Sequence, residues 1–167
     1  KFRGFSAPGR TRQHSIFNGL NDIRKYARDS DYVFVHDAAR PFVSFSLIAD
    51  CIEAVKGHDG VLPVLPMKDT VYFSGDGRKI SSLLERSRVY AGQAPELFVL
   101  GKYYEANRQL SPDGILKING STEPAVLAGM DIVMIPGDEK NFKITTAADL
   151  ERFQEIVQNN KMIEPPG

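Results

Sequence analysis

The sequence is poor in the residue types that build disulfides and structural metal sites. It contains a single cysteine, Cys51, so the chain cannot form an internal disulfide. Cys51 lies in an apolar helical pattern, which is typical of a small buried side chain. Beside that cysteine there are only three scattered histidines, a combination that does not support a structural zinc site.

Neither sign of charge is in excess, and long apolar runs are absent. Lys plus Arg equals Asp plus Glu at 21 each, which gives no electrostatic case for a nucleic acid or an acidic membrane as partner. No apolar stretch approaches the roughly 20 residues that span a bilayer, and the first ten residues lack the apolar core of a signal peptide. We therefore expect a cytoplasmic protein that binds neither nucleic acid nor membrane, and any phosphate binding must be local.

What the sequence does contain is an alternation of buried strands and amphipathic helices. The patterning predicts strands over 32–36, 60–66 and 131–136, and helices over about 14–28, 46–56, 99–110 and 147–159. Such an alternation predicts an α/β fold with a mainly parallel sheet and right-handed crossovers. Because prolines interrupt the strand at 60–66, we expect them at strand ends or on a sheet edge.

The turn-rich stretch between the second strand and the third helix predicts a projecting hairpin. We place this β-arm at about residues 67–95 of a single domain that covers residues 1–160. Residues 161–167 form a tail that we expect to fray.

Polar residues follow two of the expected strands directly. Asp37 and Arg40 come after the strand at 32–36, and Lys143 follows the strand at 131–136. Ligands of open α/β sheets bind outside the carboxyl ends of the strands, so these residues are expected to converge there. Arginine can hold a phosphate with two parallel hydrogen bonds, and Asp37 could bind hydroxyl groups or magnesium. Equally, an aspartate at a strand end can cap a turn, and Arg40 and Lys143 can be ordinary surface charges.

The arm carries two further arginines, Arg86 and Arg88, on either side of Ser87. Charges on an arm can simply protect a sheet edge from aggregation. The functional alternative is that an arginine of the arm reaches a site, including a site in a neighbouring subunit. His36 has no evident serine or cysteine partner, so a hydrolase triad is poorly supported. Several cations with one or two acids suit phosphoryl or nucleotidyl transfer, in which positioning and charge neutralisation do most of the work.

Five segments occur in an order that resembles one enzyme family: GRTRQHSIFNGL, YVFVHDAARPF, PMKDTVY, LERSRVYAGQAPELF and GDEKNFKITTAADL. Together they resemble the 2-C-methyl-D-erythritol 4-phosphate cytidylyltransferases of the non-mevalonate isoprenoid pathway, over nearly the whole chain up to about residue 157. The resemblance implies a Rossmann-like nucleotidyltransferase sheet flanked by helices. It also implies a reaction in which the sugar-phosphate oxygen attacks the α-phosphorus of CTP and pyrophosphate leaves with Mg²⁺.

The same resemblance implies roles for individual residues. Lys143 and Arg86 would be catalytic and would position the methylerythritol phosphate, with Arg86 donated by the arm of a partner subunit in a homodimer. Four residues would line the substrate pocket: Asp37, Arg40, Thr70 and Thr145. Gly9 and Ser15 would lie near the cytidine, and Asp37 would also lie close to the metal and the ribose.

Three features depart from the family pattern. The sequence contains no glycine-rich loop of the kind that wraps the CTP triphosphate, so we expect an N-terminally incomplete domain that binds CTP poorly and does not turn over as given. Ala94 stands where the family usually has a threonine that contacts the substrate. The stretch NGSTEPAVLAG replaces the usual Thr-Asp-Asp stretch, and Glu123 could supply the acid there.

Two alternatives stay open at this point. A sister enzyme that acts on ribitol 5-phosphate or a related polyol phosphate would share fold, CTP and mechanism. Such sisters tend to have valine where Ala39 stands, which favours the methylerythritol interpretation mildly. The second alternative, favoured by the missing loop, is an inactive sugar-phosphate-binding or dimerisation module.

Overall fold

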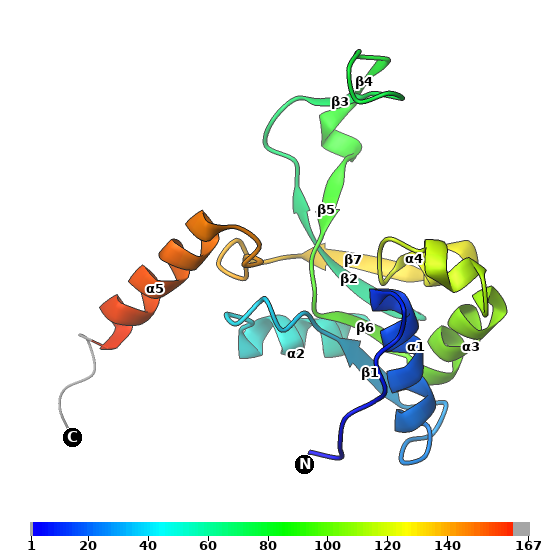
Figure 1. Cartoon of the computed structure of the whole chain (residues 1–167). Coiled ribbons are helices and arrows are strands. Elements are labelled where there is room, and N and C mark those ends of the chain that lie inside the picture. The colour runs from blue at the N-terminus through cyan, green and yellow to red at the C-terminus, as the bar shows by residue number, and fades with distance from the viewer. Residues whose placement is uncertain (1, 162–167) are drawn as a thin grey trace.

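The computed structural model describes residues 2–161, in which strands and helices alternate along the chain (Figure 1). The strands are β1 Tyr32–Val35, β2 Gly60–Pro66, β3 Val71–Phe73, β4 Ser82–Leu84, β5 Tyr90–Gly92, β6 Glu96–Val99 and β7 Ile132–Pro136. The α-helices are α1 Arg12–Ile23, α2 Phe45–Ala54, α3 Leu100–Leu110, α4 Glu123–Leu127 and α5 Ala147–Lys161, with short 3₁₀ turns η1 Arg86–Arg88 and η2 Gly114–Lys117.

The main sheet has mixed pairing. Its order is β1-β6-β2-β5, and β7 pairs with the other side of β2. Strands β1, β2 and β7 run in the same direction, but β6 lies antiparallel between β1 and β2, so β2–β7 is the parallel pair. The α/β class is as predicted, whereas the expectation of mainly parallel neighbours is wrong because β5 and β6 enter the sheet through the arm rather than through a helical crossover.

Pro63 lies in the middle of β2 and is fully buried. This placement contradicts the expectation that the prolines of β2 mark strand ends or an edge, although Pro66 does end the strand. The antiparallel ladder changes register opposite Pro63, because Val61 pairs with Leu97 while Val64 pairs with Gly92. A proline has no N–H to donate, and a break in the ladder is a place where that loss is tolerated.

Helices cover the sheet on both faces. On one face α1, α3 and α4 pack through a core that includes Leu20, Phe98 and Tyr103. On the other face α2 packs its Cys51 and Val55 against β2 and β6. Cys51 is fully buried, as its helical pattern predicts, and burial raises the pKa of its thiol to about 11. The two cores fix the sheet, so the loops at its strand ends are held at defined positions.

Helix α1 begins earlier and ends earlier than its periodicity predicts. Its N-cap is Thr11, whose hydroxyl accepts a hydrogen bond from the backbone N–H of His14. Ser15, which we expected near the cap, lies one turn inside the helix and donates to the carbonyl oxygen of Thr11. The first apolar residue of the pattern is Ile16, so periodicity alone misses the polar first turn.

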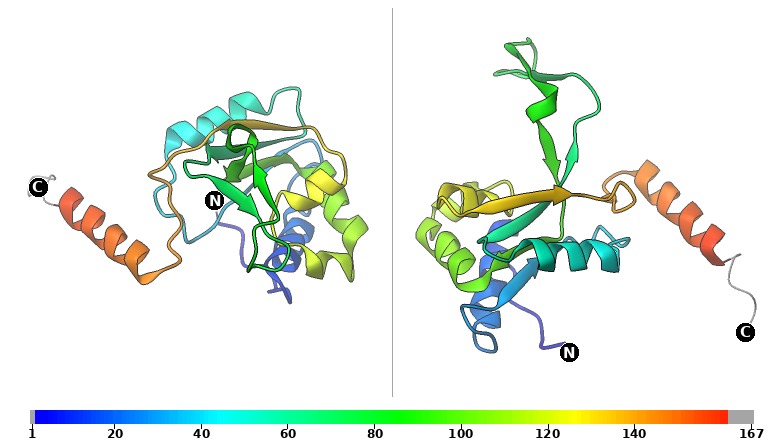
Figure 2. Two further views of the ribbon diagram at one scale, coloured as in Figure 1. Left: turned by 90° about the horizontal axis from the view of Figure 1, so that it is seen from above. Right: turned by 180° about the vertical axis from the view of Figure 1, so that it is seen from behind.

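Two elements extend away from the body of the protein. Strands β3 and β4 form a separate two-stranded sheet at the tip of the arm, which rises from the top of the body in Figure 1, and α5 projects sideways from the body (Figures 1 and 2). Apolar side chains of the arm are exposed, with Phe73 at 55% and Leu83 at 64%. Leu150 on α5 is 45% exposed, so the apolar face of this helix is not buried against the sheet as its pattern suggests.

Within residues 2–161, no helix combines the length and apolar character needed to cross a bilayer. Helix α5 continues to Lys161, the first residue of the predicted tail. The rest of that tail lies outside the described residues.

Candidate active site

The loops that follow β1 and β7 are joined side by side. The backbone N–H of Ile144 donates to the carbonyl oxygen of Ala39 at 2.9 Å. The guanidinium Nη1 of Arg40 donates to the carbonyl oxygen of Asn141 at 2.8 Å. The rings of Phe42 and Phe142 pack with their centroids 5.7 Å apart. The two polar clusters, about 100 residues apart in the chain, therefore converge at the sheet edge as predicted.

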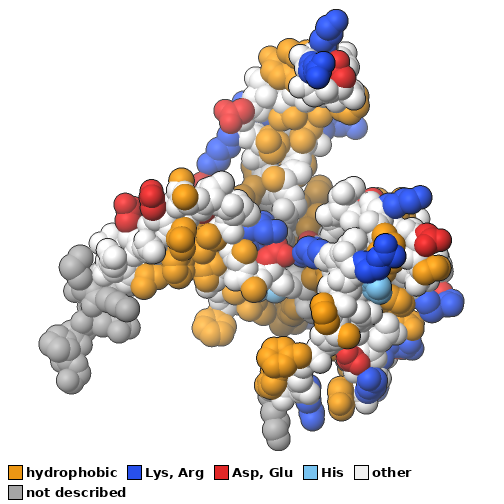
Figure 3. Space-filling view, viewed as in Figure 1, with side chains coloured by type: hydrophobic (Ala, Val, Ile, Leu, Met, Phe, Trp, Pro, Cys, Tyr) orange, Lys and Arg blue, Asp and Glu red, His pale blue; other side chains and the backbone are white. Residues whose placement is uncertain are grey.

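A cleft of ≈ 320 Å³ opens beside these loops. Figure 3 shows basic and acidic side chains gathered there, at the foot of the arm. The sheet supplies the floor through Leu62, Gly92 and Ala94. The walls come from the start of α1, the loops after β1 and β7, the start of β6, and the segment that leads into and begins α4. Their residues are Arg12, Asp37, Arg40, Glu96, Asn119, Gly120, Ser121, Thr122, Glu123 and Lys143.

Three cations surround the carboxylate of Asp37. Arg12 Nη2 lies 2.6 Å from Oδ1, Lys143 Nζ lies 3.1 Å from Oδ2, and Arg40 Nε lies 3.6 Å from Oδ2. Burial by itself would raise the pKa of Asp37, but hydrogen bonds from Arg12 and Lys143 outweigh it, so the pKa is lowered from 3.8. Around Asp37 one negative charge therefore meets three positive ones, while the two other acids that line the cleft, Glu96 and Glu123, form no salt bridge with these cations. The cations can therefore be shared with an anionic ligand.

Buried amide side chains fix this arrangement from below. Gln93 is 3% exposed, and its Nε2 donates to the carbonyl oxygens of Asp138 and Asn141 at 2.9 and 3.1 Å. Asn141 is fully buried, and its Nδ2 donates to the carbonyl oxygen of Ala94 at 2.8 Å. These bonds connect the loop that carries Lys143 to the strand that forms the cleft floor.

Arg12 and Glu96 are cleft residues that sequence reasoning missed. Arg12 stands among several basic residues near the N-terminus, and only the fold shows that it contacts Asp37. Glu96 is 8% exposed, and its Oε1 accepts a hydrogen bond from the Ser121 hydroxyl at 2.6 Å. Burial raises the pKa of Glu96, offset in part by the hydroxyls of Ser121 and Thr122. In the sequence, Glu96 is marked by being a single acid within the otherwise apolar stretch APELF, and this feature could have identified it.

The arm residues are not part of this cleft. Thr70 precedes β3 and is exposed. Arg86 is exposed in η1, and its Nη1 donates to the carbonyl oxygen of Lys68 at 2.8 Å within the arm. Within one chain the structure therefore separates Thr70 and Arg86 from Asp37 and Lys143, and their roles stay predictions.

Three other predicted site residues have local structural roles here. The backbone N–H of Gly9 donates to Ser15 Oγ at 2.9 Å, and a Cβ on Gly9 would lie 2.5 Å from the backbone carbon of His14. The turn before α1 therefore requires glycine for steric reasons. Thr145 donates its hydroxyl and its backbone N–H to Asp149 Oδ2 at the start of α5. None of the three lines the cleft, and their contacts with nucleotide or substrate stay predictions.

Two positions at which the sequence departs from the family pattern, Ala94 and Glu123, both lie in the cleft. Ala94 is buried and contributes only a methyl group to the cleft floor. Glu123 lines the cleft, but its Oε2 accepts hydrogen bonds from the backbone N–H groups of Asn119 and Gly120. Glu123 therefore holds the turn before α4.

The carboxyl groups here do not form a metal site by themselves. Among the described residues, no group of three or more His, Cys, Asp or Glu side chains could hold a metal ion. Both oxygens of Asp37 are engaged by cations, so the side chains present do not fit a magnesium ion held by the protein alone.

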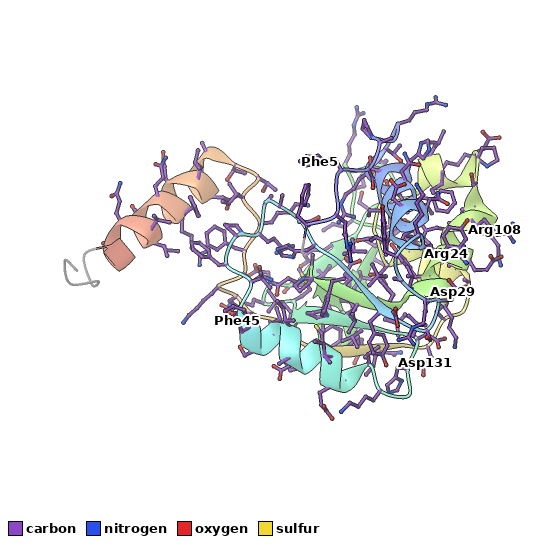
Figure 4. All side chains as sticks on the ribbon, turned by 90° about the horizontal axis from the view of Figure 1, so that it is seen from below. Phe5, Arg24, Asp29, Phe45, Arg108 and Asp131 are labelled. Atoms are coloured by element: carbon purple, nitrogen blue, oxygen red, sulfur yellow. The ribbon has the colours of Figure 1, made fainter. Side chains whose placement is uncertain are left out.

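A larger hollow of ≈ 860 Å³ lies elsewhere, between α3, the loop that follows α1 and the turn that follows α4. Figure 4 shows its residues Arg24, Asp29 and Arg108 at the far end of the molecule. Arg24 pairs with Asp29 at 2.8 Å, and Arg108 pairs with Glu105 at 2.7 Å. Each cation of this surface has an acid of its own, whereas three cations share Asp37 in the cleft, so the cleft is the better candidate for anion binding.

Comparison with known protein families shows which family the chain belongs to. The family model described as IspD, 2-C-methyl-D-erythritol 4-phosphate cytidylyltransferase, matches residues 5–159. The chain belongs to this family. Its α/β sheet with flanking helices is the fold of the family's solved structures.

Curated relatives of this IspD-family chain include enzymes with one and with two activities. The chain is 34% identical over 153 residues to "Bifunctional enzyme IspD/IspF" of Maricaulis maris, which covers 90% of this chain and 38% of that one. It is 31% identical over 167 residues to 2-C-methyl-D-erythritol 4-phosphate cytidylyltransferase of Geobacillus thermodenitrificans, which covers 98% of this chain and 69% of that one. The chain therefore spans well under half of the bifunctional Maricaulis maris relative and about two thirds of the Geobacillus thermodenitrificans cytidylyltransferase.

The structure of the Francisella tularensis 2-C-methyl-D-erythritol 4-phosphate cytidylyltransferase is similar, with a TM-score of 0.79 at 31% sequence identity. The match covers 88% of this chain and 68% of that chain. The IspD-family assignment thus holds at the level of the fold as well as the sequence.

Proposed function

We propose that the protein transfers the cytidylyl group of CTP to 2-C-methyl-D-erythritol 4-phosphate and releases pyrophosphate. The observation that carries this proposal is the convergence of Arg12, Arg40 and Lys143 on Asp37 in a cleft at the strand ends. The membership of the IspD family supports the choice of reaction.

The geometry accounts for the chemistry that such a reaction needs. The attacking group is a phosphate oxygen that is already anionic, so no strong general base is required. The main demand is to bring two anions together and to neutralise charge as the oxygen bonds to the α-phosphorus and the bond to pyrophosphate breaks. Lys143 and Arg12 are paired with Asp37 at rest, which holds them toward the cleft until an incoming phosphate shares them.

The partner in this proposal is a second copy of the chain. The arm projects from the body with exposed apolar side chains such as Phe73 and Leu83. A homodimer formed through the arm would cover these side chains and bring Arg86, with Thr70 close by in the same arm, to the neighbouring cleft. Arg86 would then add a fourth cation to the substrate phosphate.

Magnesium and cytoplasmic location stay predictions of this proposal. A magnesium ion is usually bound by one or two carboxylates together with substrate phosphates, and Asp37 is the acid nearest the cations in the cleft. Because the side chains present do not hold the ion by themselves, no step of the mechanism is assigned to it.

Two features of the cleft favour considering a second substrate, the acceptor of the sister enzymes. Ala94 offers no hydroxyl, and the carboxylate of Glu123 is engaged by the backbone. Both positions lie in the cleft, so a related polyol phosphate such as ribitol 5-phosphate is the second candidate acceptor. This alternative leaves the reaction class unchanged.

The deciding experiment measures pyrophosphate release from CTP with each of the two polyol phosphates. We expect higher kcat/KM with 2-C-methyl-D-erythritol 4-phosphate, and a preference for ribitol 5-phosphate would overturn the substrate assignment. These 167 residues contain no glycine-rich triphosphate loop, so we predict poor CTP binding and no turnover when they are produced alone. The assay is therefore repeated on the chain extended by whatever residues its gene encodes upstream. Absence of cytidylyl transfer in both forms would favour a binding or dimerisation module.

A further inference from the structure

A buried acid in the wall of the cleft lacks a hydrogen-bond partner for one of its oxygens. Glu96 is 8% exposed, and its Oε2 is buried with no partner among the described residues. The hydroxyl of Thr122, in the same wall, is close enough to lower the pKa of Glu96 but has no partner at hydrogen-bond geometry and is also buried. An unsatisfied buried polar group is costly, so two of them in one cleft indicate that a bound molecule completes their hydrogen bonding.

The position of Glu96 is fixed through its backbone and through its side chain. Its backbone pairs with Val35 in the main sheet, and its Oε1 is held by Ser121 at 2.6 Å. Ser121 is itself held, because the hydroxyl of the fully buried Tyr103 donates to its carbonyl oxygen at 2.6 Å. Glu96 therefore cannot turn toward water without breaking this chain of hydrogen bonds.

The charge around Glu96 restricts what kind of group can reach it. The cations of the cleft are paired with Asp37. The positive charge of Arg12 is near enough to lower the pKa of Glu96, but no salt bridge to Glu96 occurs among residues 2–161. A phosphate would be held by those cations and repelled by the acid. An uncharged donor suits the acid, and a hydroxyl group can donate to Oε2 while accepting from a neighbouring hydroxyl such as that of Thr122.

We propose, building on the proposed function, that Glu96 determines specificity by accepting a hydrogen bond from a hydroxyl group of the polyol phosphate. The phosphate end of the ligand lies with Lys143 and Arg12, and a hydroxyl of its carbon chain meets Glu96 across the same cleft. Glu96 thereby distinguishes a hydroxylated phosphate ester from a plain alkyl phosphate.

The test compares two ligands and two proteins by NMR titration, which measures affinities as weak as millimolar. The ligands are 2-C-methyl-D-erythritol 4-phosphate and butyl phosphate, which has a four-carbon chain without hydroxyls. In Glu96→Met we expect the affinity for the polyol phosphate to fall about tenfold, the size of one hydrogen bond to a buried acid. The affinity for butyl phosphate should change less than twofold, and an equal loss for both ligands would overturn the proposal.

A second pair of variants separates ligand contact from support of the loop. Ser121→Ala removes the bond that holds Glu96 but keeps the carboxyl group, and we expect it to change the ratio of the two affinities less than threefold. If Ser121→Ala reproduces the effect of Glu96→Met, Glu96 acts through the loop and the inference is wrong. Should Glu96→Met not fold, Glu96→Gln replaces it, and there the ratio must fall at least threefold.

Lys143→Ala distinguishes failure of this inference from failure of the proposed function. We expect it to weaken both phosphate esters. If both bind in a Lys143-dependent way and Glu96→Met leaves their ratio unchanged, the Glu96 inference alone fails. If neither ester binds the unaltered protein, or if Lys143→Ala leaves binding of both esters unchanged, the proposed function is wrong. The Glu96 inference, which rests on it, is then wrong as well.

Discussion

At the scale of single residues, the carboxylate of Asp37 organises the site. It orients Arg12, Arg40 and Lys143 toward one point, which preorganises positive charge without a ligand present. Its own side chain is 13% exposed, whereas Arg12 and Lys143 are 43% and 40% exposed. The cations are thus accessible to a ligand while the acid that aims them is largely covered.

Replacing Lys143 by alanine removes one of the two accessible cations of the cleft. In an active preparation we expect kcat/KM for cytidylyl transfer to fall at least a hundredfold, about 2.7 kcal/mol of transition-state stabilisation. Steady-state kinetics measure this. The matched control is Lys140→Ala, because Lys140 is an exposed lysine of the same loop that does not line the cleft. Near-normal turnover in Lys143→Ala would show that Lys143 is an ordinary surface charge.

Asp37 also links stability to pH. Its pKa in the folded protein is lowered from 3.8, so its stabilisation is complete above that value and is lost as pH falls through the lowered pKa. We expect Asp37→Asn to lower the free energy of unfolding by on the order of 1 kcal/mol near neutral pH, a modest value because its partners are partly exposed. Urea unfolding of both proteins at several pH values checks this. A difference that persists unchanged into strong acid would mean that the charge of Asp37 is not its source.

Some residues of the site could be predicted from the sequence, and others could not. Asp37, Arg40 and Lys143 could be predicted because each follows a strand, and strand ends meet at one edge of a sheet. Arg12 could not, because it opens a helix among other basic residues and meets Asp37 only in the folded chain. Gly9 showed a further difficulty, since a glycine demanded by a tight turn cannot be distinguished by sequence from one that approaches a nucleotide.

At the scale of elements, the helices and strands were largely predictable, and their ends were less so. Strand β2 and helix α3 match their predicted ranges closely, because apolar periodicity marks the residues that face the core. The pairing of β5 and β6 beside β2 was not predictable, because it depends on where the arm leaves and re-enters the sheet. The polar first turn of α1 was missed for lack of any apolar residue.

That first turn offers a test of local stability. Thr11→Ala removes the side-chain acceptor of the His14 N–H, and we expect it to lower the free energy of unfolding by about 1 kcal/mol. Thr11→Ser keeps the acceptor and should lose much less. Thermal and urea unfolding of the two variants measure the difference. Equal losses in both would indicate that the methyl group, and not the hydroxyl, matters at this position.

At the scale of the whole molecule, the arm and α5 leave apolar surface exposed that a compact single domain would cover. In the arm, the side chains of Tyr72 and Phe73 are 54% and 55% exposed. Figure 2 shows the arm and α5 projecting clear of the body. We expect the protein to be a dimer by sedimentation velocity. We expect Phe73→Asp to shift it toward monomers with little loss of stability in the monomer, because the ring is half exposed there.

The proposed sharing of Arg86 between subunits can be tested by mixing. Arg86→Ala and Lys143→Ala should each be nearly inactive, but in a hetero-dimer one cleft would contain both unaltered side chains. Random reassociation of equal amounts makes half the dimers mixed, so we expect recovery of about a quarter of the parental kcat, provided that activity is purely additive over clefts. No recovery in mixtures that demonstrably exchange subunits would assign Arg86 to its own subunit or to no site.

The floor of the cleft and the root of the arm are the same two strands. Leu62 and Gly92 line the cleft, and β2 and β5 continue from them straight into the arm. In the proposed dimer, a shift of the arm would therefore be transmitted along continuous backbone to the floor of the cleft. If a second copy completes each cleft through its arm, as proposed, the specific activity would depend on protein concentration and would fall on dilution.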